Sequence, residues 1–356
     1  MVPTIGNTEA VVRVVVAPDK MRGTASAAEV AAAVGRAAAA AGWECDEAPV
    51  ADGGEGTLDV LGGPNRSTMV TGPLGEPVAA AWRLDGRNAV VEMARASGLS
   101  LVGGAEGNDP IGASTVGTGE LVSAAVDAGA RRVLVGLGGS ATTDGGLGAL
   151  RSLYPLHRLA GVEIVALCDV RTSFVDAAEV FAPQKGATAA QVELLRRRLE
   201  RLADVYLADH GVDVRTLAGA GAAGGLAGGL AVAGAVLHPG FDVVADEVGL
   251  YDLVAGADLV VTAEGFLDEQ SFDGKVVGSV VELAAEAGIP CVAIVGEVVD
   301  HPGAVPEGVG VVSLVDRFGE ERAHHDTVAC IEEAATEILG SAGTMRRAAP
   351  EQGPEQ

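Results

Sequence analysis

The sequence predicts an α/β protein of two domains, one with a parallel sheet and one with antiparallel hairpins. Its 356 residues are about the length of two average domains. Short β-branched runs alternate with helical patterns towards both ends of the chain, as in βαβ units. Between residues 69 and 91, turn signals separate alternating apolar runs instead, which is typical of antiparallel hairpins.

The first elements follow a strand–loop–helix order. A buried strand is expected over residues 11–16, and a helix begins at the capping box of Ser26 and Glu29 and ends at Gly42. A second strand, 46–50, leads into the glycine loop 51–57 and a short helix.

The middle of the chain continues this alternation after the hairpin region. A helix is expected to start near residue 115 and to stop at Gly129, before a strand at 133–137. Another strand lies within 161–170, and an amphipathic helix spans 189–207 with arginines on its polar face.

The C-terminal part predicts a complete βαβ unit. It consists of a strand at 258–265, a helix at 276–287 and a strand at 291–295, so that sheet is at least partly parallel. The last helix is expected at 327–339, and the polar residues beyond it are expected to be disordered.

Composition limits the classes of partner. The formal charge of −25 argues against a nucleic-acid partner. Four widely spaced cysteines and the lack of a signal-peptide pattern predict a reduced, cytoplasmic protein. The uncharged stretch 216–237 is rich in glycine, so we expect a loop and a buried helix there and no membrane association. A homodimer is left open.

The stretch 132–148 carries the strongest functional signal. An apolar run enters a loop of glycines and hydroxyls that leads into a helix, which is an arrangement that binds anions through backbone N–H groups. The residues expected to cradle phosphate are Gly138, Gly139, Ser140, Thr142 and Gly145. Asp144 in the same loop suggests a metal ion or a hydroxyl proton in the pocket. The alternative is a sharp turn that is rich in glycine for conformational reasons.

Four strand-to-helix loops, including the one just described, combine acids with glycine. They contain Asp19, Asp52 with Glu55, Asp144, and Glu264 with Asp268. Such loops gather at the carboxyl ends of parallel strands, where converging acids suit Mg²⁺. The cations Lys20, Arg22, Lys185 and Lys275 lie in similar loops. Acids for metal, cations for phosphate and the lack of a nucleophile–base pair indicate phosphoryl transfer; for each acid alone, a helix cap is the alternative.

Two common nucleotide motifs are absent from the sequence. It contains no Gly-x-x-x-x-Gly-Lys-[Ser/Thr], and the glycines after position 136 do not form a dinucleotide fingerprint. A P-loop enzyme and a nicotinamide oxidoreductase are therefore disfavoured.

Ordered motifs between residues 14 and 300 resemble the bacterial glycerate kinase family, the two-domain type without a P-loop. They are Ala-Pro-Asp (17–19), Ala-Asp-Gly-Gly-Glu-Gly-Thr (51–57), Val-Glu-Met-Ala (91–94), Ser-Gly-Leu (97–99), the segment 115–120, Gly-Gly-Ser-Ala-Thr-Thr-Asp-Gly-Gly (138–146), Cys-Asp-Val (168–170), Pro-Gln-Lys-Gly-Ala (183–187), Gly-Ala-Gly-Ala-Ala-Gly-Gly (219–225), and Glu-Gly (264–265) with Asp268 and Gln270.

The resemblance implies ATP- and Mg²⁺-dependent phosphorylation of glycerate, usually at the 2-hydroxyl, at an interdomain Mg-phosphate site. It also implies a Rossmann-like parallel α/β domain beside the second, mixed α/β domain. We place the Rossmann-like domain at 1–66 and 240–345, the second domain at 67–239 and a disordered tail at 346–356.

Roles for individual residues follow from the loops and the resemblance together. Asp144 is the candidate general base or metal ligand, and Glu264 is the second candidate metal ligand. The expected catalytic residues are Asp144, Asp52, Glu264 and Arg22; the ATP-binding ones are Gly138, Gly139, Ser140, Thr142, Gly145, Lys185 and Lys275; and the substrate-binding ones are Asp19, Glu55 and Asp268.

Three departures from the usual family pattern bear on the substrate. Arg22 stands where the family usually has lysine, Phe266 replaces an arginine, and a segment that usually follows Asp169 is missing. An arginine and a phenylalanine differ in charge and in hydrogen-bonding geometry. A kinase of a related small hydroxy acid, or a non-catalytic paralogue that binds a nucleotide or organic acid, is therefore the alternative to a glycerate kinase.

Overall fold

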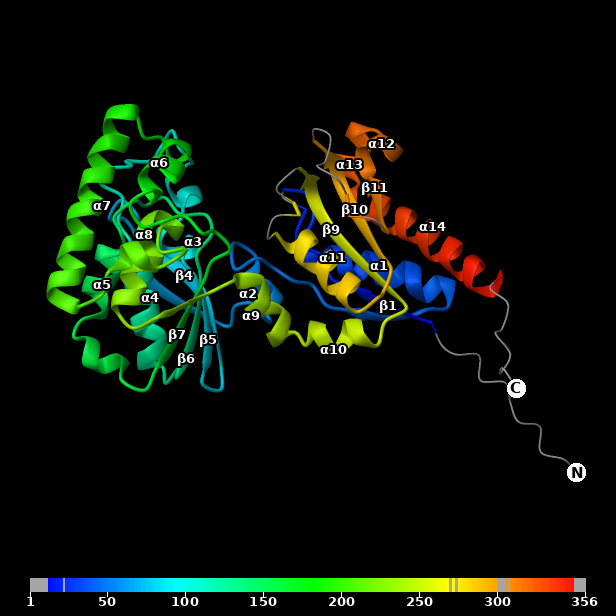
Figure 1. The fold of residues 1–356 in the computed structure, drawn as a ribbon, viewed down its shortest axis with the longest axis horizontal. Coiled ribbons are helices and arrows are strands. Elements are labelled where there is room, and N and C mark those ends of the chain that lie inside the picture. The colour runs from blue at the N-terminus through cyan, green and yellow to red at the C-terminus, as the bar shows by residue number, and fades with distance from the viewer. Residues whose placement is uncertain are drawn as a thin grey trace, which may run out of the picture. The chain divides into compact units, whose positions relative to one another are not determined.

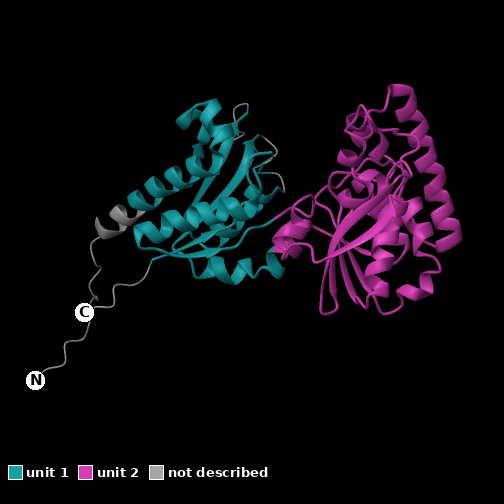
Figure 2. Ribbon diagram, turned by 180° about the vertical axis from the view of Figure 1, so that it is seen from behind, with its two compact units in different colours: residues 1–50, 245–356 teal, residues 51–244 magenta. Residues whose placement is uncertain are grey.

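The computed structural model describes residues 12–21, 23–268, 271–272, 275–299, 305–306 and 308–348. The chain is built from the mixture of helices and strands drawn in Figure 1. It divides into two compact units, coloured separately in Figure 2: unit 1 comprises residues 1–50 and 245–356, and unit 2 comprises residues 51–244. Within the described residues, no helix is both long and apolar enough to cross a membrane.

Unit 1 contains a parallel sheet of five strands in the order β11-β10-β9-β1-β2. The strands are β1 (Arg13–Val16), β2 (Glu44–Glu47), β9 (Leu259–Leu267), β10 (Cys291–Val298) and β11 (Val309–Ser313). Val14, Val15 and Val16 are all fully buried, as expected for a strand that is covered on both faces.

The helices of unit 1 are α1 (Ala27–Ala41), α10 (Leu250–Ala255), α11 (Val276–Glu286), α12 (Leu314–Phe318), α13 (Glu320–His325) and α14 (Thr327–Ala348). Buried side chains of α1 and α14 form one core with β1, β9 and β10. The capping box of Ser26 and Glu29 starts α1 as predicted, and Gly42 ends it in a left-handed conformation.

Unit 2 contains a mixed sheet of six strands in the order β3-β4-β5-β6-β7-β8. The strands are β3 (Arg66–Thr71), β4 (Pro77–Asp85), β5 (Asn88–Glu92), β6 (Arg132–Gly136), β7 (Glu163–Leu167) and β8 (Val236–His238). The first three strands form antiparallel hairpins, and β5 to β8 run parallel. The carboxyl ends of β5, β6 and β7 therefore lie at one edge of the sheet.

The helices of unit 2 are α2 (Thr57–Val60), α3 (Ala94–Ser97), α4 (Val116–Asp127), α5 (Leu147–Leu153), α6 (Ala177–Phe181), α7 (Ala189–His210) and α8 (Ala222–Val232), while α9 (Gly240–Glu247) spans the division between the units. The main core of the unit joins the sheet to α4, α5 and α8. Between α6 and α7 the chain forms a single turn of 3₁₀ helix, η3 (Pro183–Lys185).

These sheets confirm the predicted fold class, a parallel α/β domain with a second, mixed α/β domain. The units divide after residues 50 and 244, whereas the sequence analysis placed the divisions after 66 and 239. Loop 51–57 belongs with unit 2 because the Glu92 carboxylate accepts hydrogen bonds from the N–H groups of Gly56 and Leu58, each at 2.9 Å.

The predicted end of the last helix was wrong. Helix α14 continues to Ala348, past the expected end at residue 339 and into the first residues of the tail predicted at 346–356. The Ser341 hydroxyl donates to the Glu337 carbonyl at 2.8 Å, so this polar side chain is accommodated on the helix itself. Residues 349–356 lie outside the described part of the chain.

Candidate functional site

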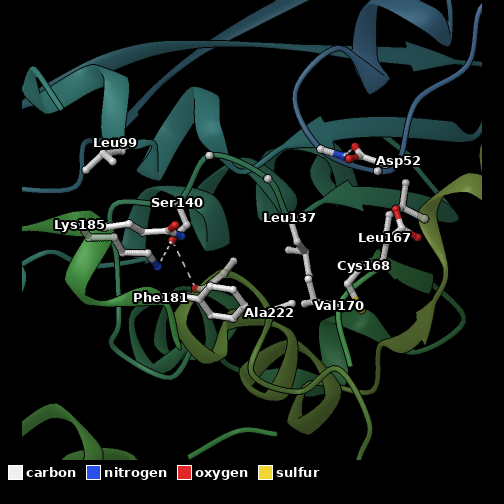
Figure 3. Close-up of a pocket in the computed structure, with 17 residues that line it drawn as sticks. Asp52, Leu99, Leu137, Ser140, Leu167, Cys168, Val170, Phe181, Lys185 and Ala222 are labelled. Atoms are coloured by element: carbon white, nitrogen blue, oxygen red, sulfur yellow. Dashed lines mark hydrogen bonds between the residues drawn. The ribbon is translucent and has the colours of Figure 1, made fainter. Parts of the chain in front are cut away.

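A pocket of about 390 Å³ opens in unit 2 at the carboxyl ends of β6 and β7. This is the edge of a parallel sheet where α/β proteins bind ligands. The lining residues are Asp52, Gly53, Gly54, Leu99, Leu137, Gly138, Gly139, Ser140, Leu167, Cys168, Asp169, Val170, Phe181, Gln184, Lys185, Ala222 and Ala223. Figure 3 shows Lys185 and Ser140 on one side, Asp52 and Cys168 on the other, and Leu137 and Phe181 between them.

The acidic end of the pocket is formed by Asp52 and Asp169. The Asp169 carboxylate accepts a hydrogen bond from Gly240 N–H at 2.7 Å through Oδ1, while its Oδ2 is buried without a partner in the described residues. Asp52 accepts from Gly54 N–H at 2.8 Å. A Cβ at Gly240 would lie 2.1 Å from the Asp52 carbonyl oxygen, so three segments of the chain meet here closely.

Burial raises the pKa of Asp169 to about 7, and the neighbouring Asp52 charge contributes to this rise. Hydrogen bonds from the N–H groups of Gly240 and Phe241 lower it, but less than burial raises it. A carboxyl group with a pKa near 7 and one unused oxygen is suited to accept a proton from a bound hydroxyl group at neutral pH.

The basic end of the pocket is Lys185, whose side chain is only 3% exposed. Its ammonium group donates to the Thr142 carbonyl at 2.6 Å and to Ser140 Oγ at 3.2 Å. Burial lowers the pKa of Lys185 to about 7, although the charge of Asp144 opposes this shift. Asn108 holds η3 in place by donating to the Lys185 carbonyl at 2.9 Å.

The glycine loop after β6 contributes its first residues to the pocket and its later ones to packing. A Cβ at Gly138 would lie 2.6 Å from Gly54 Cα, so this glycine allows two loops to meet at the pocket wall. Among the residues described, Thr142 and Gly145 do not line the cavity. Gly145 instead receives a hydrogen bond from Tyr206 Oη on its carbonyl at 3.0 Å.

Asp144 is not among the described residues that line the pocket, and its carboxylate is saturated with donors. It accepts from the N–H groups of Thr115 at 2.9 Å, Gly146 at 3.0 Å and Gly148 at 3.2 Å. The Thr115 hydroxyl adds a hydrogen bond at 2.8 Å. These donors lie at the N-termini of α4 and α5, so the contacts of Asp144 favour an architectural role over proton transfer.

A second group of predicted residues lies in unit 1, at the carboxyl ends of β1 and β9. Lys275 Nζ is 3.0 Å from each carboxylate oxygen of Asp268 and 4.0 Å from Glu264 Oε1. Asp19 N–H donates to the Ala263 carbonyl at 2.9 Å, which places Asp19 beside this strand end. Arg22 lies outside the described residues.

Glu264 is the unusual acid of this group. Burial raises its pKa to about 7, with Lys275 lowering it and Asp19 raising it. Its Oε2 is buried with no hydrogen-bond partner in the part of the chain that the structure describes. Glu264 therefore has an oxygen available for a ligand.

The structure thus distributes the predicted residues over two units. It brings Asp52, Gly138, Gly139, Ser140 and Lys185 together in one pocket, and Glu55 lies exposed beside it. It places Asp19, Glu264, Asp268 and Lys275 in the other unit.

The sequence analysis did not select Asp169, although it placed the residue at a strand end. Asp169 is the pocket acid with the unpartnered oxygen. The available signal was its position two residues after the buried run of β7, where a ligand-facing side chain is common. Leu99 and Phe181, which form apolar walls, carried no such signal.

Comparison with known proteins agrees with this architecture. The model of the glycerate kinase family matches residues 14–154 and 155–342. The chain is 37% identical to a glycerate kinase of Bacillus subtilis, over 92% of this chain and 100% of that protein. It is also 37% identical to the glycerate 2-kinase of Escherichia coli K12, over 85% of this chain and 90% of that protein.

A solved structure extends the likeness to three dimensions. The crystal structure of a Salmonella typhimurium LT2 protein assigned as glycerate kinase 2 superposes with a TM-score of 0.81 at 32% identity, covering 95% of this chain and 100% of that one. The fold and pocket define a two-unit α/β protein with a partly polar pocket at strand ends. The chain belongs to the glycerate kinase family.

Proposed function

We propose that this protein transfers the γ-phosphoryl group of ATP to a hydroxyl group of glycerate. The observation that carries the proposal is the pocket of unit 2, in which Asp169 offers an unpartnered carboxylate oxygen across from the buried ammonium of Lys185. A hydroxy acid matches both ends, and relatives that are 37% identical to this chain are named glycerate kinase and glycerate 2-kinase.

In the proposed reaction, Asp169 is the general base. Its Oδ2 takes the proton as the hydroxyl oxygen of the acid forms a bond to the γ-phosphorus. The bond from that phosphorus to the β,γ-bridging oxygen breaks, and ADP leaves with the electron pair. The nearby charge of Asp52 helps to keep the Asp169 pKa at about 7, so the group both accepts the proton and releases it to water.

The residues of unit 1 fit a role with the phosphates and Mg²⁺. Of the two predicted metal ligands, Asp144 does not fit, because its oxygens already accept several N–H groups. Glu264 fits, because Oε2 is buried and unpartnered among the described residues. When bound, Mg²⁺ neutralises charge on the β- and γ-phosphate oxygens. Lys275, within 4.0 Å of Glu264, would lie near the same phosphates.

We propose that residues of both units are needed for catalysis, in line with the interdomain site that the sequence predicts. We expect turnover to need Glu264 of unit 1 as well as Asp169 of unit 2. Binding of the acid, in contrast, should depend on unit 2 alone. Glu264→Gln should therefore abolish turnover while leaving the dissociation constant for the acid unchanged.

The test is an ADP-release assay with ATP, Mg²⁺ and D-glycerate. We expect turnover in the wild type and in Asp209→Asn, a control that changes an exposed aspartate on α7. Binding of glycerate without any ADP release would instead identify a non-catalytic paralogue. Absence of both would refute the assignment to glycerate.

A related, larger hydroxy acid is the second candidate substrate. The pocket volume of about 390 Å³ falls in the range of sites that hold ligands larger than a three-carbon acid. A screen of small hydroxy acids in the same assay, ranked by kcat/KM, decides between glycerate and such a substrate.

A further inference from the structure

Lys185 is a buried cation without an acidic partner. Its ammonium group contacts one carbonyl and one hydroxyl oxygen, and no ion pair joins it to a carboxylate of the described residues. An ammonium group has three N–H donors, so two such contacts leave one donor. A buried charge is costly unless it is paired, and Lys185 lines the pocket. These facts indicate an anion site.

The charge of the pocket limits which anion can bind. Of the residues that line it, Lys185 is the cation, and Asp52 and Asp169 are the acids. A triphosphate carries several negative charges, and in this pocket a single ammonium group would face it together with two carboxyl groups. A carboxylate carries one negative charge, which a single ammonium group balances.

The acidic end adds a second requirement. The unpartnered Oδ2 of Asp169 can only accept a hydrogen bond while the group is ionised, so it selects ligands that carry a donor. An alcohol supplies that donor. A ligand that satisfies both ends is therefore an acid with one carboxylate and at least one hydroxyl group.

On this basis, and resting on the proposed kinase function, we infer that Lys185 and Ser140 bind the carboxylate of the acceptor and make the pocket selective for hydroxy monocarboxylates. Neutral polyols have no carboxylate for Lys185 to bind. Dicarboxylates would place a second negative charge near Asp52 and Asp169. ATP phosphates are bound by other residues. Lys185, which the sequence predicted as a phosphate ligand, is then the residue that recognises the carboxylate of the acid.

Ser140 is held where it can assist Lys185. Its hydroxyl group accepts from the Lys185 ammonium and lies 3.3 Å from the Ala223 carbonyl and 3.1 Å from Thr142 Oγ1. Thr142 N–H also donates to Ser140 Oγ at 3.1 Å. The hydroxyl hydrogen can rotate from these neighbours towards a bound carboxylate, which makes Ser140 the second contact of the anion site.

The experiment compares ligands by titration calorimetry on the full-length protein, with and without a non-hydrolysable ATP analogue. The acids are D-glycerate and the dicarboxylate tartronate, and glycerol is the neutral analogue. For the wild type we expect glycerate to bind at least about 10-fold more tightly than either of the others, since a charged hydrogen bond is lost or a second charge is added.

Lys185→Met is the main variant, and Arg197→Met, which removes an exposed arginine of α7, is the matched control. Lys185→Met should weaken glycerate binding about 10- to 100-fold while changing the dissociation constant of the ATP analogue less than about 3-fold. Ser140→Ala should weaken glycerate binding less, about 3- to 10-fold. It also serves as the test if Lys185→Met fails to fold.

Several outcomes would overturn the inference. They are unchanged glycerate binding in both variants, a larger loss for the ATP analogue than for glycerate, and wild-type binding of glycerol as tight as that of glycerate. Failure of the proposed function is a separate result, because a protein that binds glycerate through Lys185 but releases no ADP refutes the kinase assignment and leaves the acid site standing.

Discussion

Asp144 and Asp169 are two aspartates of the same unit, each in a loop that follows a parallel strand, but their surroundings are opposite. The carboxylate of Asp144 accepts three backbone N–H groups and a threonine hydroxyl. Asp169 accepts N–H groups on one side only, and its Oδ2 has no partner in the described residues. The glycine motif predicts a functional role for Asp144, whereas the unpartnered oxygen belongs to Asp169.

We infer from this difference that Asp144 holds the fold together and that Asp169 takes part in the proposed reaction. Donors saturate Asp144 and hold the N-termini of α4 and α5 together. Asp169 is partly buried beside another carboxylate, so its ionised form is destabilised and its pKa rises to about 7. A polar group that the fold leaves unsatisfied costs stability, and such groups concentrate at functional sites.

The largest expected effect comes from Asp169→Asn. The amide oxygen can still accept from Gly240 N–H, but the side chain cannot take a proton, so kcat should fall about 10²- to 10⁴-fold. The free energy of unfolding at pH 8 should rise, since a buried charge is removed. ADP release and chemical denaturation measure the two effects, with Asp209→Asn as the control. A variant that retained kcat would remove Asp169 from the reaction.

Asp144→Ala should act through stability. It leaves the N–H groups of Thr115, Gly146 and Gly148 without their acceptor, at a cost of about 3–5 kcal/mol in the free energy of unfolding. Activity should be lost in parallel with the folded fraction. If the variant instead kept wild-type stability and lost only kcat, Asp144 would be a reactive acid after all and the contrast with Asp169 would fail.

The fold was largely predictable because its signals are local. A capping box starts α1, and β-branched runs form β1, β6 and β9. The division after residue 50 was not predictable, because loop 51–57 is held by Glu92, a residue distant in sequence. The short strand β8 was also missed, since three residues carry too little periodicity.

The site was predictable only in part, for a similar reason. Lys185, Gly138 and Gly139 belong to sequence motifs that are typical of ligand binding, and all three line the pocket. The saturation of Asp144 depends on Thr115, and the pKa of Asp169 depends on burial and on Asp52. Such environments arise from tertiary contacts and leave no trace in the spacing of residues.

The pH dependence of stability extends the comparison to Lys185. Its pKa in the folded protein is about 7, below the 10.5 of an exposed lysine, so the unfolded chain binds more protons between these values. The buried ammonium group of Lys185 therefore lowers the free energy of unfolding by its full amount below pH 7, and this loss shrinks as the pH rises. The stability advantage of Lys185→Met over the wild type should fall by at most about 1.4 kcal/mol per pH unit between pH 7 and 9.

Denaturation with urea at several pH values measures this trend. Arg197→Met is the control, because its exposed guanidinium should show a constant difference from the wild type. A constant difference for Lys185→Met as well would mean that the ammonium group is not destabilised by burial, and the case for an anion site would weaken accordingly.

The smallest expected effect concerns the backbone beside the pocket. Around Asp144, left-handed conformations are occupied by glycines, including Gly145 and Gly146, whereas the pocket wall contains Ala223 at φ 54° and ψ 40°. This conformation costs an alanine about 1 kcal/mol, partly offset by burial of its methyl group. Ala223→Gly should therefore raise the free energy of unfolding by about 0.5 kcal/mol, measured by urea denaturation. A loss of more than about 1 kcal/mol would show that the methyl group packs more favourably than the backbone is strained. Packing of the methyl group would then outweigh the backbone strain at Ala223, and the unsatisfied polar groups alone would distinguish the pocket side of the unit from the Asp144 side.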